Sequence, residues 1–212
     1  MRSTDPDFLL HTAEHHFFNH SDVLAHQALT QLLAQQRKHP RANELMALLM
    51  ARAGHSVQAL RHFEIASATD GCSGEALYQY GRLLFQSGKA DKAIKMLKKA
   101  AAKNPEHFEA QHDLGLALAQ TGRHQDALAT FQRAAALNDH SAELHFNIAH
   151  LLELLDRPNA ALAAYAKALQ ITNEDVAGWK QAGTLFEELQ KRLGAFAAAG
   201  EQAALTFQGA WS

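Results

Sequence analysis

Histidine offers the most chemistry in this sequence, because 14 of the 212 residues are histidines. His11 and His15 are four residues apart, and so are His16 and His20. Residues four apart share one face of a helix, so either pair could fill two positions around zinc or nickel. Neither pair has a cysteine or a clear third ligand beside it, which favours surface imidazoles and predicts no metal centre and no cofactor. Metal storage through these histidines remains an alternative.

The other reactive side chains form no recognisable catalytic motif. Serine, histidine and acidic residues are all present, but no nucleophile elbow, phosphate-binding loop or dinucleotide fingerprint occurs. Cys72 is the only cysteine, which excludes an intramolecular disulfide, and we expect its thiol to be inert. The sequence therefore predicts that the protein is not an enzyme.

Charge and hydropathy exclude further classes of function. The 20 Lys and Arg against 22 Asp and Glu give a formal net charge of -2, which argues against a general nucleic-acid-binding protein. One basic cluster could bind an acidic partner or could simply be a solvated helix face: Lys89, Lys92, Lys95, Lys98, Lys99 and Lys103. No apolar run approaches the roughly 20 residues of a membrane span. Residues 1–6 lack the apolar core of a secretory signal, so we expect a cytoplasmic protein.

The elements that position these side chains follow a pattern that returns every 34 residues. Small residues recur at Ala25, Ala59, Ala93, Ala127 and Ala161, and large ones at Leu29, Phe63, Leu97, Phe131 and Tyr165. Glycines keep the same step at Gly54, Gly88 and Gly122. Recurrence in one phase means that one supersecondary unit is copied along the chain, which points to a binding scaffold.

Within one copy, residues 108–141, the apolar spacing predicts two helices with a break between them. Gly122 stands at the break, where a left-handed backbone conformation can end the first helix. Gly115 and Ala127 are small enough to let the two helices approach closely, and Phe131 fills the volume between neighbouring copies. Such a short helix pair cannot bury its apolar faces alone, so each copy depends on the next.

These motifs resemble the tetratricopeptide repeat family. One copy reads Leu77-x2-Tyr80-Gly81-x2-Leu84, Ala93-x3-Leu97, Ala100 and Pro105, and the next reads Gln111-x2-Leu114-Gly115-x2-Leu118, Ala127-x3-Phe131 and Ala134, with Asp139 where proline is expected. The resemblance implies an all-α, right-handed solenoid of antiparallel helix pairs. We expect one domain over residues 1–212 with about five to six repeats and a C-terminal capping helix. The predicted repeats are 6–39 (divergent), 40–73, 74–107, 108–141 and 142–175, followed by a degenerate repeat with capping helices at 176–209.

In this family the first helices of successive repeats line a concave face where peptides bind. The resemblance therefore implies a peptide site at Tyr78, Gln79, Arg82, Glu109, His112, Asp113, Glu143, Phe146, Asn147, His150, Lys180 and Gln181. The stripe Gln79, Asp113, Asn147 and Gln181 partly resembles the amide ladder in the repeat region of O-linked N-acetylglucosamine transferases. Only Asn147 keeps the asparagine, so ordinary solvated positions are the alternative.

The charge of these positions indicates the ligand. The carboxylate clamp that other family members use for chaperone tails does not carry over, because matching positions hold residues such as Asp113 and Glu143 instead of cations. A mainly acidic groove favours a basic or neutral peptide. We thus expect a non-catalytic protein–protein interaction scaffold without nucleic-acid binding or membrane insertion. The alternative is the substrate-recognition region of a larger bacterial glycosyltransferase, sulfotransferase or methyltransferase; the oligomeric state is not predicted.

Overall fold

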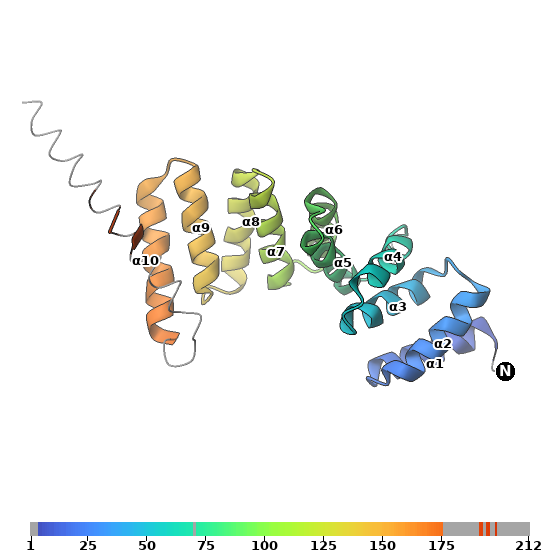
Figure 1. The fold of residues 1–212 in the computed structure, drawn as a ribbon. Coiled ribbons are helices and arrows are strands. Elements are labelled where there is room, and N and C mark those ends of the chain that lie inside the picture. The colour runs from blue at the N-terminus through green and yellow to red at the C-terminus, as the bar shows by residue number, and fades with distance from the viewer. Residues whose placement is uncertain (1–3, 70, 176–190, 193, 196–197, 199–212) are drawn as a thin grey trace, which may run out of the picture. The chain divides into compact units, whose positions relative to one another are not determined.

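The structure is a computed structural model that describes residues 4–69, 71–175, 191–192, 194–195 and 198. Up to Asp175 the described residues form ten helices and no strand, which confirms the expected all-helical fold (Figure 1). The helices are α1 (Pro6–Phe18), α2 (Asp22–Gln35), α3 (Pro40–Arg52), α4 (Ser56–Ala66), α5 (Gly74–Gln86), α6 (Ala90–Lys103), α7 (Phe108–Gln120), α8 (His124–Leu137), α9 (Ala142–Leu154) and α10 (Pro158–Asp175). No described helix is long and apolar enough to cross a membrane.

The chain divides into two compact units, unit 1 at residues 1–110 and unit 2 at residues 111–212. In unit 1, α1 packs on α2, α3 on α4 and α5 on α6, and α3 also contacts α1 and α5. In unit 2, α9 packs against both α8 and α10. Consecutive helices therefore form pairs, and within unit 1 the first helices of neighbouring pairs touch one another.

The residues that recur in phase form the core of each pair. The five alanines at 25, 59, 93, 127 and 161 are fully buried, and so are the large side chains of Leu29, Phe63, Leu97, Phe131 and Tyr165. A small residue next to a large one on the second helix lets the first helix lie close while the large side chain fills the remaining space. The helix pairs thus pack through the positions that the 34-residue pattern marks.

The first helix of every pair ends in the same way. A positive φ is found at His20 (55°), Gly54 (78°), Gly88 (73°), Gly122 (76°) and Asp156 (57°), each 34 residues after the last. The N–H of the following residue donates to the carbonyl five residues earlier, as Arg123 does to Leu118 over 3.0 Å. This is the hydrogen bond of a Schellman motif, which satisfies carbonyls that the helix leaves unpaired. The left-handed conformation predicted for Gly122 is confirmed.

The starts of the same helices are capped at an equally regular position. The capping residues are Asp5, His39, Ser73, His107 and Ser141, and each side chain accepts a hydrogen bond from a backbone N–H two or three residues later. Such caps satisfy N–H groups that have no partner inside the helix. Two of the caps are imidazoles, His39 and His107, whose Nδ1 atoms each lie 3.2 Å from the nitrogen they accept from.

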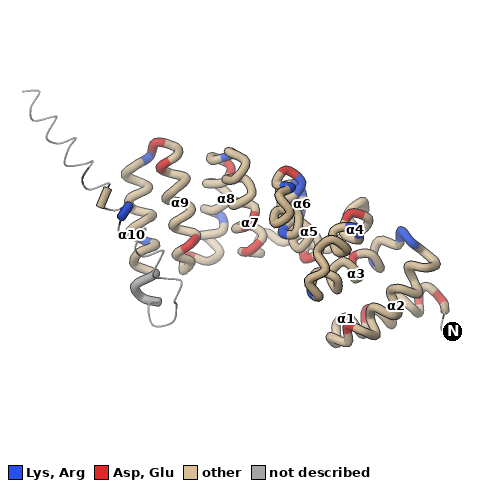
Figure 2. Tube along the Cα trace, viewed as in Figure 1, with Lys and Arg blue, Asp and Glu red and all other residues tan. Residues whose placement is uncertain are grey.

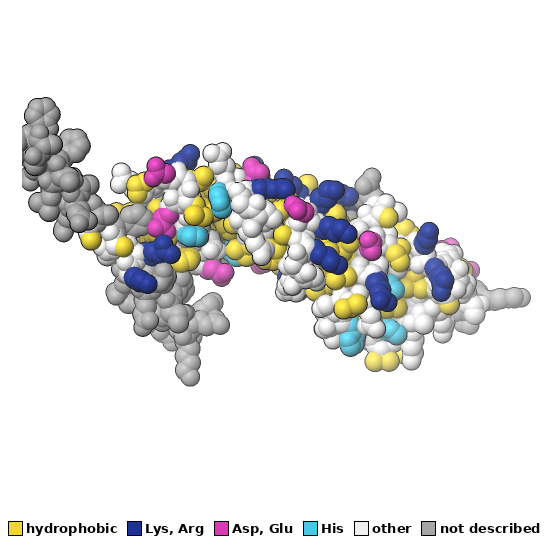
Figure 3. All heavy atoms as spheres, turned by 45° about the horizontal axis from the view of Figure 1, so that its top comes forward, with side chains coloured by type: hydrophobic (Ala, Val, Ile, Leu, Met, Phe, Trp, Pro, Cys, Tyr) yellow, Lys and Arg dark blue, Asp and Glu magenta, His cyan; other side chains and the backbone are white. Residues whose placement is uncertain are grey.

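The six lysines singled out in the sequence lie on or next to α6, and all are exposed. They occupy the side of α6 opposite its buried residues Ala93, Ile94 and Leu97. Figure 2 shows the basic residues along this helix, and Figure 3 shows their side chains gathered on the surface over it. Only Lys103 has a printed contact, a 2.7 Å hydrogen bond to the Cys72 carbonyl.

Candidate functional site

The structure links two of the predicted site residues of unit 1 through a third side chain. On α5, Gln79 Nε2 donates to Glu75 Oε1 over 2.7 Å, and Arg82 donates to Gln79 Oε1 over 2.7 Å. The three side chains therefore form a continuous polar row along one face of α5. Gln79 is partly buried, whereas Glu75 and Arg82 are exposed.

His107, which the sequence did not single out, joins the other two predicted residues of unit 1. Its Nε2 lies 3.6 Å from a Glu75 oxygen and its Nδ1 lies 3.2 Å from a Glu109 oxygen. Its ring centroid is 4.7 Å from that of Tyr78, which is only 8% exposed. Tyr78 thus packs inside the face instead of projecting from it. The signal for His107 was its phase, because Ser73 and Ser141 cap helices one repeat away on either side.

A pocket of about 480 Å³ opens between α1, α3 and α5 of unit 1. Its lining residues are Phe17, Phe18, Arg41, Leu45, Leu48, Ala51, Arg52, Ser73, Glu75, Gln79 and Arg82. Sequence reasoning predicted Gln79 and Arg82 but missed the residues from α1 and α3. The repeat itself could have found them, since Arg41, Leu45 and Leu48 stand 34 residues before Glu75, Gln79 and Arg82.

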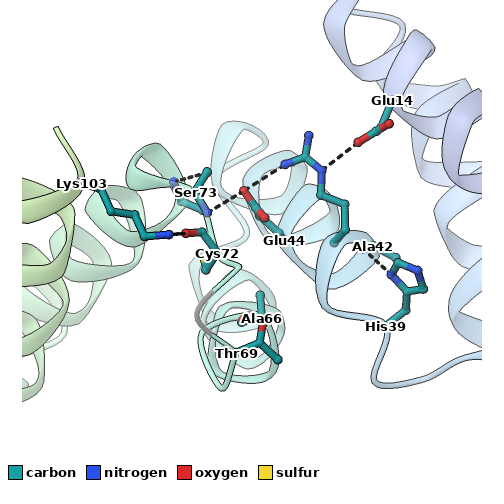
Figure 4. A network of polar contacts seen from close by, with 11 residues as sticks. Glu14, His39, Ala42, Glu44, Ala66, Thr69, Cys72, Ser73 and Lys103 are labelled. Carbon is teal, nitrogen blue, oxygen red and sulfur yellow. Dashed lines mark hydrogen bonds and ion pairs between the residues drawn. The ribbon is translucent and has the colours of Figure 1, made fainter.

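Arg41 is held at the edge of this pocket by two carboxylates. Its Nε donates to Glu14 over 2.8 Å, and its NH1 lies 3.1 Å from Glu44 Oε1. Glu44 is 2% exposed and also accepts from the backbone N–H of Ser73 over 3.3 Å, so the network joins α1, α3 and the start of α5 (Figure 4). Burial acts to lower the pKa of Arg41, but Glu14 and Glu44 outweigh it and raise that pKa above its usual value. Arg41 is therefore a fixed cation.

The other two arginines of the pocket are also positioned by neighbours. Arg52 donates to Asp22 over 2.7 Å, and its guanidinium carbon lies 4.7 Å above the centroid of the Phe17 ring. Arg82 lies 5.9 Å from the Tyr78 ring, and among the described residues it has no carboxylate partner. Cation–π contact and hydrogen bonds limit the side-chain freedom that a ligand would otherwise have to remove.

In unit 2 the predicted residues fall into two groups. On α7, His112 Nδ1 lies 3.6 Å from Asp113, and the His112 ring packs 5.6 Å from that of Phe131. On α9, the Phe146 ring lies 5.7 Å from that of Tyr165, and His150 lies 3.6 Å from Glu153. The described contacts do not join the two groups.

Asn147 on α9 differs from its neighbours, because its buried Nδ2 has no hydrogen-bond partner among the described residues. An unpaired buried amide is costly, so its N–H groups are suited to an acceptor from another molecule. Glu143, one turn earlier on α9, is exposed. Lys180 and Gln181, which were predicted to extend this face, lie outside the described residues.

The four candidate metal-binding histidines are spread along α1 and the turn that follows it. His15 and His16 have ring centroids 5.5 Å apart, His15 lies 3.2 Å from the Asn19 amide nitrogen, and His20 lies 3.5 Å from Arg52. Within the described part of the chain, no three His, Cys, Asp or Glu side chains are grouped so that they could hold a metal ion.

Residues 78–142 and residues 142–175 each match the tetratricopeptide repeat in comparison with protein families. The chain contains tetratricopeptide repeats. No curated protein matches it in sequence. Proteins built from these repeats are generally non-catalytic scaffolds, so the matched residues identify a class of molecule and not a reaction.

Solved structures of tetratricopeptide proteins share the fold over most of this chain. YrrB, a tetratricopeptide protein with an unusual peptide-binding site, matches with a TM-score of 0.76 at 18% identity, over 90% of this chain and 94% of its own. MamA matches with a TM-score of 0.68 at 18% identity, over 84% of this chain and 97% of its own. MamA AMB-1 gives 0.69 at 23% identity, over 85% and 96%. At these identities the likeness establishes the fold alone.

Proposed function

We propose that this tetratricopeptide chain is a non-catalytic scaffold that binds an extended peptide segment of a partner protein. The proposal is supported by the fold that it shares with YrrB, which has a peptide-binding site. The observation that carries it is the unpaired amide of Asn147 on the first helix α9. An amide can donate to a peptide carbonyl and accept from a peptide N–H, so it holds a backbone whatever its side chains are.

Two neighbours of Asn147 give the ligand its expected character. Phe146 is partly buried against Tyr165, so its remaining surface can contact an apolar side chain. Glu143 is exposed on the same helix and would attract a basic group. Glu153 contributes less, because it already pairs with Arg192 and accepts from the Tyr165 hydroxyl. The ligand that fits is a basic or neutral peptide, and its binding should weaken as salt rises.

The test is a peptide-array screen of the full chain at low and high salt, followed by titration of the best peptides against variants. Asn147→Ala should weaken binding of every peptide, because it removes a contact with the backbone. Glu143→Lys should weaken basic peptides more than neutral ones. The matched controls are Gln132→Ala and Asp126→Lys, which alter an exposed amide and an exposed carboxylate on α8. Enrichment of acidic peptides that ignore Asn147→Ala would overturn the proposal.

A further inference from the structure

We propose that the pocket of unit 1 is a second binding site, which takes a peptide segment with a large apolar side chain between acidic residues. The inference rests on the proposed function in one respect, that first helices of this chain bind peptides. It uses none of the residues of α7 and α9, and its ligand has the opposite charge. The chain would then bind two classes of segment at two separate surfaces.

The floor of the pocket is apolar. Leu45 and Phe17 are almost fully buried beneath it, and Leu48 and Ala51 are partly exposed to it. Phe18 lines it as well and is 65% exposed, an unusual state for a phenylalanine beside a hollow of this size. Pockets of roughly 300–1,000 Å³ with apolar walls are typical of ligand sites, and this one can bury a large side chain. The floor therefore calls for an apolar anchor.

The rim of the pocket is rich in hydrogen-bond donors. Arg41, Arg52 and Arg82 stand around it, and Glu75 is the one carboxylate among the residues described as lining it. A guanidinium has five N–H groups in a planar fork, and the recorded contacts of each arginine occupy only part of that fork. Glu75 is itself turned toward Gln79 and His107. A ligand that enters must bring acceptors, and carboxylates match guanidinium geometry best.

The acids beside the arginines do not remove this preference. Glu14, Glu44 and Asp22 pair with Arg41 and Arg52, so the two arginines act mainly as oriented donors with little net charge. Arg82 has no such partner among the described residues and supplies the uncompensated positive charge. A basic ligand would have to face all three arginines with a single carboxylate in return, which disfavours it.

The spacing of the arginines sets the spacing of the acids. Arg41 lies near the start of α3 and Arg52 at its end, and the 11 residues between them correspond to about 16 Å of helix. An extended peptide covers that distance with about five residues. The fitting segment thus has its apolar anchor near the centre and an acidic residue about two positions away on each side.

The probe for this site is a short synthetic peptide, acetylated and amidated, with a central tryptophan flanked on both sides by glutamates. Its binding to the full chain is followed by the anisotropy of an attached dye. We expect saturable binding that weakens about tenfold when the glutamates are replaced by glutamines, and likewise when the tryptophan is replaced by alanine. A peptide with lysines in place of the glutamates should not bind at this pocket.

Variants of the full chain locate the site. Arg82→Glu should weaken the acidic peptide about tenfold or more, because it reverses the uncompensated charge. Lys95→Glu makes the same charge change on exposed α6 and should leave binding unchanged, and equal helicity by circular dichroism shows that both variants fold. Asn147→Ala should have no effect, which separates this site from the one on α9. No saturable binding, stronger binding of the lysine peptide, or equal losses for Arg82→Glu and Lys95→Glu would each overturn the inference.

Discussion

Gly115 lies so close to the ring of Phe131 that no side chain fits between them. A Cβ atom on Gly115 would stand 2.5 Å from Cε1 and 2.6 Å from Cδ1 of that ring. Phe131 is fully buried, so its ring has no free space into which it could turn. The expectation that Gly115 is a point of close helix packing is confirmed.

Gly115→Ala should therefore destabilise the protein, although alanine favours a helix over glycine by about 1 kcal/mol. Displacing the Phe131 ring costs about 1–3 kcal/mol, which outweighs the gain in helix propensity. The matched control is Gly74→Ala in α5, where an added Cβ would meet its nearest atom at an ordinary 3.4 Å. Thermal unfolding by circular dichroism compares the two, and a melting temperature that falls no more for Gly115→Ala than for Gly74→Ala would contradict the packing argument.

Gly122 provides a second prediction, one that concerns the backbone alone. Its φ is +76°, and an added Cβ would meet nothing within 4 Å, so a substitution there is penalised only by the left-handed conformation. Gly122→Ala should lose about 1 kcal/mol of stability. Gly122→Asn should lose less, because asparagine adopts this conformation more readily. Urea unfolding of both variants checks the order, and equal losses would mean that the conformation is not what limits the site.

Much of the fold could be predicted from the sequence, because phase alone fixes which residues face the core. Glycine likewise marked the left-handed turn at Gly122. The same turn at His20 and Asp156 was not visible, since neither residue type requires a positive φ. At these two positions the neighbouring helices impose the conformation, and a single sequence carries no local signal for it. Asp139 is a similar case: instead of proline it supplies acceptors to His145 and Lys167.

The candidate site was harder to predict, because phase gives the face of a helix but not the contacts of a side chain. Tyr78 shares the face of Gln79, yet it is buried because its ring packs on His107. The prediction of an acidic groove considered repeats from residue 74 onward and left out α3. Arg41 and Arg52 on that helix change the chemistry of unit 1, and their ion pairs with Glu14, Glu44 and Asp22 depend on side-chain reach across three helices.

Cys72 should be unreactive in the folded protein. It is 3% exposed, and burial, reinforced by the charge of Glu44, raises the pKa of its thiol to about 11 in spite of Lys103, Lys99 and Arg41. Only the thiolate is alkylated, so a pKa about two units above the usual 9.0 lowers the reactive fraction about a hundredfold at neutral pH. Iodoacetamide labelling followed by mass spectrometry should be slow for the native chain and fast in urea. Similar rates in both states would contradict a buried thiol.

His62 should make the stability of the protein sensitive to acid. Its Nδ1 lies 2.8 Å from Asn43 Oδ1, and Asn43, which is 1% exposed, donates through Nδ2 to the carbonyls of Arg37 and His39. Because the Asn43 oxygen is the acceptor, His62 must donate from Nδ1. Burial, helped by the charge of His26, lowers the pKa of His62 below its usual 6.5.

The folded chain therefore holds fewer protons on His62 than the unfolded chain does between the lowered pKa and 6.5. In that window stability rises with pH, and it falls as the pH drops below 6.5 toward the folded pKa. The variant His62→Gln does not titrate at this position, so its melting temperature should fall less over the same interval. Arg61→Gln, an exposed change on the same helix, should keep the full loss. Parallel curves for His62→Gln and the unchanged chain from neutral to acidic pH would show that His62 contributes nothing to the acid sensitivity.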